Sequence, residues 1–309
     1  MVGGYRSGPT FNRSPVFRAQ RARTVQGRGV LRTLSAARTL GPGDYNAALD
    51  LCATDPLANV FVAARLIEGG PTFTGSLLGV EASRQLRSLC WISANVVPVA
   101  ADGEALDAYA ARLRRKRRRC SSIFGDSEQV LGLWSRLERH WGGARSVRPD
   151  QPMMAVSTAP LLSGRPIDSR VRPARVDEVD IVLPASARMF TEEIGYAPYL
   201  GSDRDYRRMV AALIRAGHTF VIVEDGRVIF KADIGSLASG VAQIQGVWVA
   251  PDRRGQGVAV PAMNAVVQQV IDTIAPTVTL YVNAYNEPAL RTYHAAGFRQ
   301  VSRFATVIL

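Results

Sequence analysis

The sequence predicts an α+β fold built from two copies of one unit, each a mixed, largely antiparallel sheet flanked by helices. The chain of 309 residues is long enough for two domains with separate cores. Its 47% apolar and 21% charged residues are typical of a globular protein. Each half also shows the order strand-strand-strand-helix-strand-helix-strand. The prediction depends on this order, because the two halves share no obvious residue identity.

In the first half, two helices are expected to precede the unit, at 44–51 and 56–68. The second helix has Val60, Ala63, Ala64 and Ile67 on one face. The unit itself is expected as strands at 76–80, 86–92 and 96–99, a helix from Glu104 into a basic run, a strand at 120–124, and a helix capped by Asp126 that ends near Gly142.

In the second half, Val171 lies in a short strand, and the helix at 206–216 spaces Met209, Val210, Leu213 and Ile214 helically. An Asp-Gly pair predicts a tight hairpin turn. The expected elements are helices at 176–194 and 206–216, hairpin strands at 220–223 and 228–234, a strand at 241–249, a helix, a strand at 277–282, a helix at 286–296 and a strand pair at 301–309. The loop around Gly164 marks the expected boundary between two domains, at 41–165 and 166–309, and a tail at 1–40 precedes them.

The positive charge is concentrated at the N-terminus. The formal net charge is +12, and eight arginines precede the first acidic residue, Asp44. These arginines therefore account for two thirds of the excess positive charge. A Gly-, Ser- and Arg-rich tail cannot bury a core, so we interpret it as a disordered extension or the product of an upstream start site. Its composition also resembles a transit peptide, although its helical apolar face is poorly developed.

The cysteine count and the apolar runs bear on location. Three widely spaced cysteines, Cys52, Cys90 and Cys120, argue against a disulfide framework or a cysteine-rich zinc site. No metal-ligand spacing is visible, and no apolar run is long enough to suggest a membrane span. We therefore expect a cytoplasmic protein without a metal site or a membrane partner.

The stretch VWVAPDRRGQGVAVPAMNAVVQQVI, at 247–271, carries the clearest chemical signal. A strand gives way to a helix whose first turn tolerates Pro261. Free amides at the start of this helix, near Gly257, would point toward an anion. Gly255 and Gly257 leave the backbone accessible, and Arg253 and Arg254 add positive charge. The pattern predicts a phosphate or pyrophosphate site, although a tight strand-to-helix turn is the plainer alternative.

Two familiar phosphate loops do not fit. A P-loop needs Gly-Lys-Ser/Thr, but neither lysine of the chain, Lys116 or Lys231, follows a glycine. A dinucleotide fingerprint needs a third glycine where this chain has Val260.

The segment Arg254-Gly255-Gln256-Gly257-Val258-Ala259 resembles the Arg/Gln-x-x-Gly-x-Gly/Ala loop of the GNAT acetyltransferase superfamily. A second stretch, from Asn286 through Tyr293 to Gly297-Phe298, is similar to that family's later signature. The resemblance covers roughly 168–309. It implies the GNAT fold, acetyl-CoA or another acyl-CoA as co-substrate, and acyl transfer to an amine acceptor.

The resemblance also implies site residues. The amides of Gly255, Gln256, Gly257, Val258 and Ala259 would hold the pyrophosphate, beside Arg253 and Arg254. The backbone at Val247 and Val249 would pair with the pantetheine arm and polarise the thioester carbonyl. Asn286 would cap its helix or bond the cofactor. Tyr293 would protonate the leaving thiolate, unless it is only a core aromatic.

The general base is not identified by the pattern. Many family members carry a glutamate where this chain has Gln245, and an amide cannot take a proton at neutral pH. Glu192 and Glu193 are candidates for the base or for the acceptor site. A water relay, a deprotonated substrate, and a plain surface role for both glutamates remain alternatives.

The first half lacks both signatures. Ala-Ala-Asp-Gly-Glu follows Val99, and no tyrosine corresponds to Tyr293. It resembles the degenerate half of a tandem GNAT protein of the actinobacterial type, and the preference for arginine over lysine suits a GC-rich genome.

The basic run 112–119 carries seven positive charges at a helix end, where they complement the dipole. Without interleaved aromatic residues, we expect a solvated face rather than nucleic-acid binding.

Two functions follow. The first is an N-acetyltransferase in which an amine attacks the thioester directly. The alternative is a non-catalytic acyl-CoA-binding or regulatory protein, with or without an association with nucleic acid. The acceptor, the acyl group and the oligomeric state are not specified by the sequence.

Overall fold

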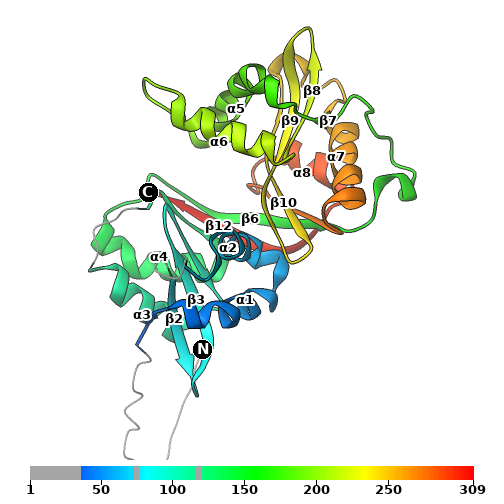
Figure 1. The fold of residues 1–309 in the computed structure, drawn as a ribbon. Coiled ribbons are helices and arrows are strands. Elements are labelled where there is room, and N and C mark those ends of the chain that lie inside the picture. Colours follow the sequence, from blue (N-terminus) through cyan, green and yellow to red (C-terminus); the bar gives the residue numbers. More distant parts are fainter. Residues whose placement is uncertain (1–35, 73–76, 116–119) are drawn as a thin grey trace, which may run out of the picture. The chain divides into compact units, whose positions relative to one another are not determined.

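The structure, a computed structural model, describes residues 36–72, 77–115 and 120–309. The Arg-rich tail and most of the basic run therefore lie outside the described residues. Within these ranges, twelve strands form one sheet in the order β1-β2-β3-β4-β5-β12-β6-β11-β10-β9-β8-β7 (Figure 1). The strands are β1 (Arg38–Thr39), β2 (Leu77–Ala82), β3 (Gln85–Ile92), β4 (Asn95–Val99), β5 (Ser122–Asp126), β6 (Ser146–Val156), β7 (Arg172–Pro173), β8 (Thr219–Glu224), β9 (Arg227–Ala238), β10 (Val241–Val249), β11 (Thr277–Tyr281) and β12 (Arg299–Ile308).

The helices begin and end largely where the sequence signals them. Asp126 caps α4 by accepting a hydrogen bond from the Gln129 amide, and Gly195 ends α5 in the left-handed conformation. The helices are α1 (Tyr45–Ala53), α2 (Pro56–Gly69), α3 (Gly103–Leu113), α4 (Ser127–Trp141), α5 (Val179–Ile194), α6 (Arg204–Arg215), α7 (Ala259–Thr273) and α8 (Glu287–Ala295), with short 3₁₀ turns η1 (Pro42–Asp44), η3 (Pro160–Ser163), η4 (Val176–Glu178) and η5 (Pro251–Arg253).

The expected repeat is confirmed. The first half gives β2-β3-β4-α3-β5-α4-β6, and the second gives β8-β9-β10-α7-β11-α8-β12. Each copy contains one parallel pair, β4 with β5 and β10 with β11, among antiparallel neighbours. The α+β class with a largely antiparallel sheet is therefore confirmed.

The two copies exchange their last strands, which the sequence did not predict. β12, from the second half, pairs with β5 on one side and β6 on the other. β6, from the first half, pairs with β11. The two strands run side by side where the halves join (Figure 1). Ala305 and Val307 of β12 accordingly lie in a core cluster made otherwise of first-half residues.

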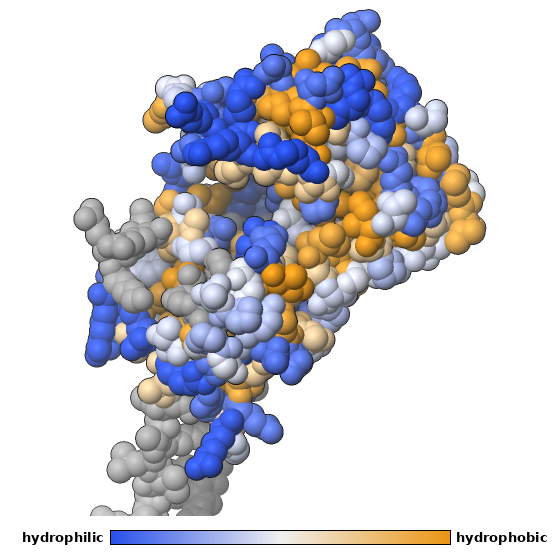
Figure 2. Space-filling view, viewed as in Figure 1, coloured by the Kyte–Doolittle hydropathy of each residue, from blue (hydrophilic) through white to orange (hydrophobic). Residues whose placement is uncertain are grey.

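Several local expectations need correction. The C-terminal strand pair is one long strand, β12. Ile67 is 52% exposed and Leu66 is buried in its place, because the helix face is rotated relative to the predicted stripe. Met209 is exposed on α6, whose outer face is hydrophilic (Figure 2). The helix from Glu104 ends at Leu113, at the start of the basic run. No described helix is long and apolar enough to cross a membrane.

A buried ion pair lies on β9. Lys231 Nζ lies 2.5 Å from Asp233 Oδ2, and the lysine side chain is 0% exposed. Removing one partner leaves the other charge buried and uncompensated, so we expect Lys231→Met to lower the free energy of unfolding by about 3–5 kcal/mol. The double variant Lys231→Met/Asp233→Leu should recover most of that loss, as measured by urea denaturation. A single variant as stable as the wild type would show that the pair contributes nothing.

Candidate active site

The two strands of the second parallel pair separate along their length. β10 and β11 are in register only from Val241↔Thr277 to Gln243↔Thr279. Beyond Gln243, β10 continues to Val249 paired with β9 alone, while β11 continues paired with β6. A wedge therefore opens between the ends of β10 and β11, and the β10 backbone that faces it is not paired with β11.

A β-bulge in β10 lies at this opening. The register with β9 shifts between Gln245 and Trp248. Gly246, inside the bulge, has φ +60°, and a Cβ there would lie 3.0 Å from Asp233 Oδ2. The site therefore needs glycine for both conformation and space. The bulge includes Val247, so this residue has no β9 partner and its backbone is free to face a ligand.

The loop before α7 presents unpaired amides. Gly255 and Gly257 have φ of +73° and +77°, and a Cβ at either position would meet nothing within 4 Å. No side chain caps α7. No described residue accepts a hydrogen bond from the amides of 255–260. The first described turn of α7 is thus an open anion site at the positive end of a helix dipole.

Both loop arginines form ion pairs. Arg253 lies 2.7 Å from Glu224, and Arg254 lies 2.6 Å from Glu192. Arg254 Nε also donates to the carbonyl of Val249. The loop is further held by Gln256, whose Nε2 donates to the Asp252 carbonyl at 2.7 Å. The arginines therefore lie beside the amides, but their charge is partly compensated.

The last turn of α5 lies across the opening between β10 and β11. Glu192 faces the β10 side, where it accepts from Trp248 Nε1 at 3.4 Å and pairs with Arg254. Glu193 faces the β11 side, where Asn283 Nδ2 donates to its Oε1 at 3.4 Å. The structure thus brings both predicted glutamates to the opening, one on each side.

Tyr293 lies on α8 and is 8% exposed. Its ring packs edge-on against Phe298, with 5.9 Å between centroids. Its hydroxyl has no hydrogen-bond partner among the described residues. Burial raises the pKa of this hydroxyl above its ordinary value, and the negative charge of Glu193 raises it further. Tyr293 therefore stays protonated at neutral pH and keeps an unused donor.

Asn286 serves as a helix cap. Its side-chain oxygen accepts from the Ala289 amide at 3.3 Å at the start of α8. Of the two roles predicted for it, capping is the one that the structure shows.

The matching helix of the first half starts differently. Asp102 caps α3 by accepting from the Ala105 amide at 2.9 Å, and Glu104 lies in the same turn. The Ala101 amide donates to Gln129 Oε1. A carboxylate occupies the position that an anion would need, and its charge would repel a phosphate.

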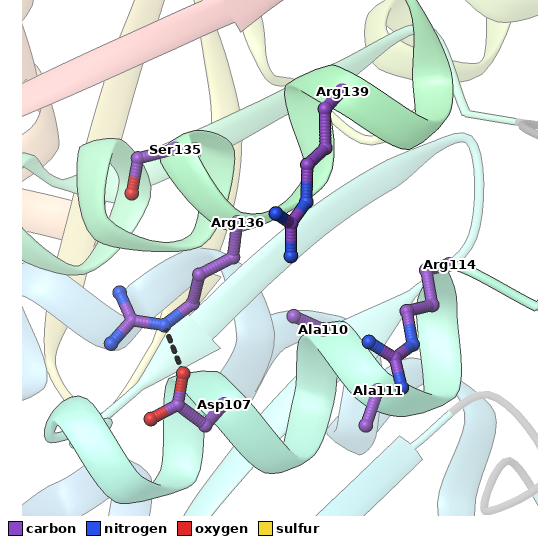
Figure 3. Close-up of a pocket in the computed structure, with 7 residues that line it drawn as sticks. All are labelled: Asp107, Ala110, Ala111, Arg114, Ser135, Arg136 and Arg139. Atoms are coloured by element: carbon purple, nitrogen blue, oxygen red, sulfur yellow. Dashed lines mark hydrogen bonds and ion pairs between the residues drawn. The ribbon is translucent and has the colours of Figure 1, made fainter.

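Two hollows lie on the described surface, one beside the opening and one away from it. One, of about 400 Å³, borders Glu192 and is lined by Ala187, Arg188, Thr191, Glu192, Ala197, Pro198 and Tyr199. The other, of about 280 Å³, lies between α3 and α4. Arg136 and Arg139 project into it from α4 and Arg114 from the end of α3 (Figure 3). Arg136 is paired with Asp107 at 2.6 Å.

Several residues at the opening were not predicted from the sequence. Arg148 and Gln151 come from β6, in the other half of the chain, and Asn283 follows β11. Gln151 Nε2 donates to Asn283 Oδ1 at 2.9 Å. Asp233, beside the bulge, lies opposite Gln245 in the sheet. Of these residues, only Asp233 had a signal in the sequence, because Lys231 and Asp233 are two charged residues in an otherwise apolar strand.

The comparisons with known proteins fit this geometry. Residues 186–298 match the sequence model of the acetyltransferase (GNAT) family. This segment is a GNAT domain. Residues 75–182, before the GNAT domain, match a domain of unknown function (DUF4081). A search of curated proteins found no match.

Solved GNAT structures share the fold over most of the chain. A GCN5-related N-acetyltransferase from Sphaerobacter thermophilus aligns with a TM-score of 0.58 at 17% identity, covering 87% of this chain and 93% of its own. A tandem GNAT protein from the clavulanic acid biosynthesis pathway gives 0.52 at 16%, covering 88% and 98%. A GNAT-family acetyltransferase from Colwellia psychrerythraea gives 0.51 at 13%, covering 88% and 99%. At these identities, the likeness concerns the fold, and it extends over both halves.

Proposed function

We propose that the protein is an acyl-CoA-dependent N-acyltransferase that transfers acetyl from acetyl-CoA to a primary amine by direct attack in a ternary complex. The observation that carries the proposal is the row of unpaired amides at 255–260, located at the end of an opening between two sheet strands. A diphosphate suits the amides, and an extended pantetheine arm suits the unpaired edge of β10. The match to the GNAT family model supports the same assignment.

Donor binding falls to the loop and the bulge. The amides of Gly255 to Ala259 would bind the pyrophosphate, with Arg253 and Arg254 beside it. The backbone at Val247 and Val249 would bond the pantetheine arm, and an amide there would stabilise negative charge on the thioester oxygen. One such donor contributes about 3 kcal/mol to the transition state. The residues present therefore fit the group.

The chemical steps need one base and one acid. Acetyl-CoA supplies an acyl group activated as a thioester. Glu193 would take a proton from the ammonium of the acceptor, whose nitrogen then attacks the thioester carbon. As the carbon–sulfur bond breaks, Tyr293 would give its proton to the departing sulfur. The acylated nitrogen would lose its second proton to the tyrosinate through solvent, so that the products are a neutral amide and the free thiol of CoA. Glu192 borders the 400 Å³ hollow, through which the acceptor would approach.

The first half has a supporting role in this proposal. Its α3 is capped by Asp102 and leaves no anion site, so we infer a GNAT-like domain without a cofactor site. We place the domains at 41–165 and 166–309, with a reducing cytoplasm as the location.

The test is turnover with purified protein. Acetyl-CoA should raise the melting temperature by mass action, and a panel of amines should reveal at least one that releases free CoA and gains an acetyl group by mass spectrometry. A non-catalytic binding protein would show the thermal shift without CoA release. No thermal shift and no calorimetric heat with any acyl-CoA would contradict the proposal.

A second candidate is association with a polyanion, and the hollow between α3 and α4 is the observation that favours it. Three arginines line the hollow, at the end of the helix that leads into the basic run (Figure 3). The C-terminal ends of both helices also favour cations there. Salt-sensitive binding of a DNA or RNA oligonucleotide that is lost in Arg114→Glu/Arg139→Glu would support this function, and binding unchanged by these substitutions would exclude this hollow.

A further inference from the structure

We propose that Arg148, on the strand that the first half inserts beside the GNAT domain, is a positioning residue for the proposed acyl transfer, because it holds Glu193 at the opening between β10 and β11. The inference rests on the proposed function and adds a role for the first half: it completes the active site of the second.

The geometry around Glu193 is asymmetric. Arg148 Nη1 lies 2.7 Å from Glu193 Oε1, and Arg148 Nη2 donates to the Glu193 backbone carbonyl. One guanidinium thus fixes both the side chain and the last turn of the helix that carries it. The Arg148 side chain is 11% exposed, whereas that of Glu193 is 48% exposed. The arginine is the buried anchor, and the carboxylate remains open to solvent and to an acceptor.

Arg148 is itself part of a supported strand. Gln151, three residues along β6, is 2% exposed and bonds Asn283 through Nε2. Thr306 Oγ1 of β12 donates to Gln151 Oε1 at 2.7 Å. Asn283 in turn reaches Glu193 Oε1. The network therefore runs from both exchanged strands to a single carboxylate.

The charge of the Glu193 carboxylate acts on two tyrosines, Tyr281 and Tyr293. Burial raises the pKa of Tyr281 to about 12, with the charge of Glu193 raising it and that of Arg148 lowering it. Glu193 also raises the pKa of Tyr293. The charge of Glu193 therefore acts on one tyrosine at the end of β11 and on the proposed acid on α8. Its Oε2 is not part of any described ion pair or hydrogen bond, so one oxygen is free to accept the proton of an amine.

The strand that carries Arg148 gives the first half a role in the site of the second half. Without Arg148, the last turn of α5 loses the two hydrogen bonds that Glu193 receives from the first half. Glu193 is then free to move away from its position at the opening. Misplacing a base by about 1 Å costs roughly 100-fold in rate. Arg148 acts through Glu193, so its removal should affect the chemical step and leave donor binding intact.

The experiment compares Arg148→Ala, Arg148→Lys, Glu193→Gln and the double variant Arg148→Ala/Glu193→Gln with the wild type. Arg87→Ala is the matched control, because Arg87 is a first-half arginine that pairs with Asp102 and Glu104 away from α5. With an amine that the wild type acetylates, we expect Arg148→Ala to lower kcat by roughly 10- to 100-fold while the acetyl-CoA Kd changes by less than about twofold. Arg148→Lys should recover part of kcat, and Arg87→Ala should leave it unchanged.

The double variant decides the mechanism. If Arg148 works through Glu193, the double variant should be no slower than Glu193→Gln alone. Three results would overturn the inference. The first is a double variant whose loss of kcat is the product of the two single losses, and the second is an unchanged kcat in Arg148→Ala. The third is an equal fall in melting temperature and in kcat in Arg148→Ala and Arg87→Ala. If the wild type binds acetyl-CoA and acetylates an amine, and Arg148→Ala is equally active, then only the role of Arg148 is refuted and the proposed function stands. A wild type that neither binds nor reacts refutes the proposed function and this inference with it.

Discussion

Gly257→Ala is expected to weaken acetyl-CoA binding by roughly 10- to 100-fold, which corresponds to the loss of one or two hydrogen bonds from amides to a charged phosphate. Gly257 has φ +77° and open space around its Cβ position. An alanine there would favour a different backbone conformation and turn the amides of the α7 loop away from a shared target. The dissociation constant would be measured by isothermal titration calorimetry.

Gly142→Ala is the matched control for this prediction. Gly142 ends α4 with φ +79°, and a Cβ added there would also meet nothing within 4 Å. Both glycines have a positive φ, which costs a non-glycine residue about 1–3 kcal/mol, so both variants should lose stability in urea denaturation. Equal loss of stability with loss of affinity confined to Gly257→Ala would assign the loop to the donor. Equal affinity in both variants would remove the loop from the donor site.

Tyr293→Phe is expected to lower kcat by about 100- to 10,000-fold, the usual contribution of a positioned general acid. The acetyl-CoA Kd should change little, because the hydroxyl acts on the departing sulfur. Stability should also change little, since this hydroxyl bonds no described residue. Stopped assays of CoA release, run at saturating donor, would give kcat.

Tyr109→Phe provides the opposite pattern. Tyr109 is a fully buried tyrosine of α3 whose hydroxyl lies 2.6 Å from Ser88 Oγ. Its substitution removes a buried hydrogen bond and should cost about 1 kcal/mol of stability without affecting turnover. A Tyr293→Phe variant that is destabilised but fully active would return Tyr293 to the role of a core aromatic.

The local features of the fold could be predicted from the sequence because they depend on neighbouring residues. Asp225-Gly226 marks the turn between β8 and β9, and both residues have positive φ. Caps at Asp126 and Asn286 and the stop at Gly195 likewise fix helix ends within a few residues. The α7 loop was visible for the same reason, since its glycines and its helix are contiguous.

The remaining features depend on contacts between distant segments. Arg148 and Glu193 are separated by 45 positions, and Gln151 and Thr306 by 155. No periodicity records that β12 enters the sheet of the first half. The candidate base was obscured by a different cause: Gln245 stands where a glutamate would have marked it, and the carboxylates near the opening come from other elements. The roles of Glu192, Glu193 and Tyr293 stay predictions.

The exchange of β6 and β12 has a consequence for how the chain folds. β12 leaves the ribosome after every other described strand, and its neighbours β5 and β6 are made long before it. Ile308 of β12, for example, pairs with Ser146 of β6. During synthesis the first half must wait with an open sheet edge until β12 arrives. Such late, long-range closure slows folding and exposes a surface for self-association. Cutting the chain between the halves would leave each fragment without one strand of its sheet. Each fragment should therefore fold only when both are expressed together.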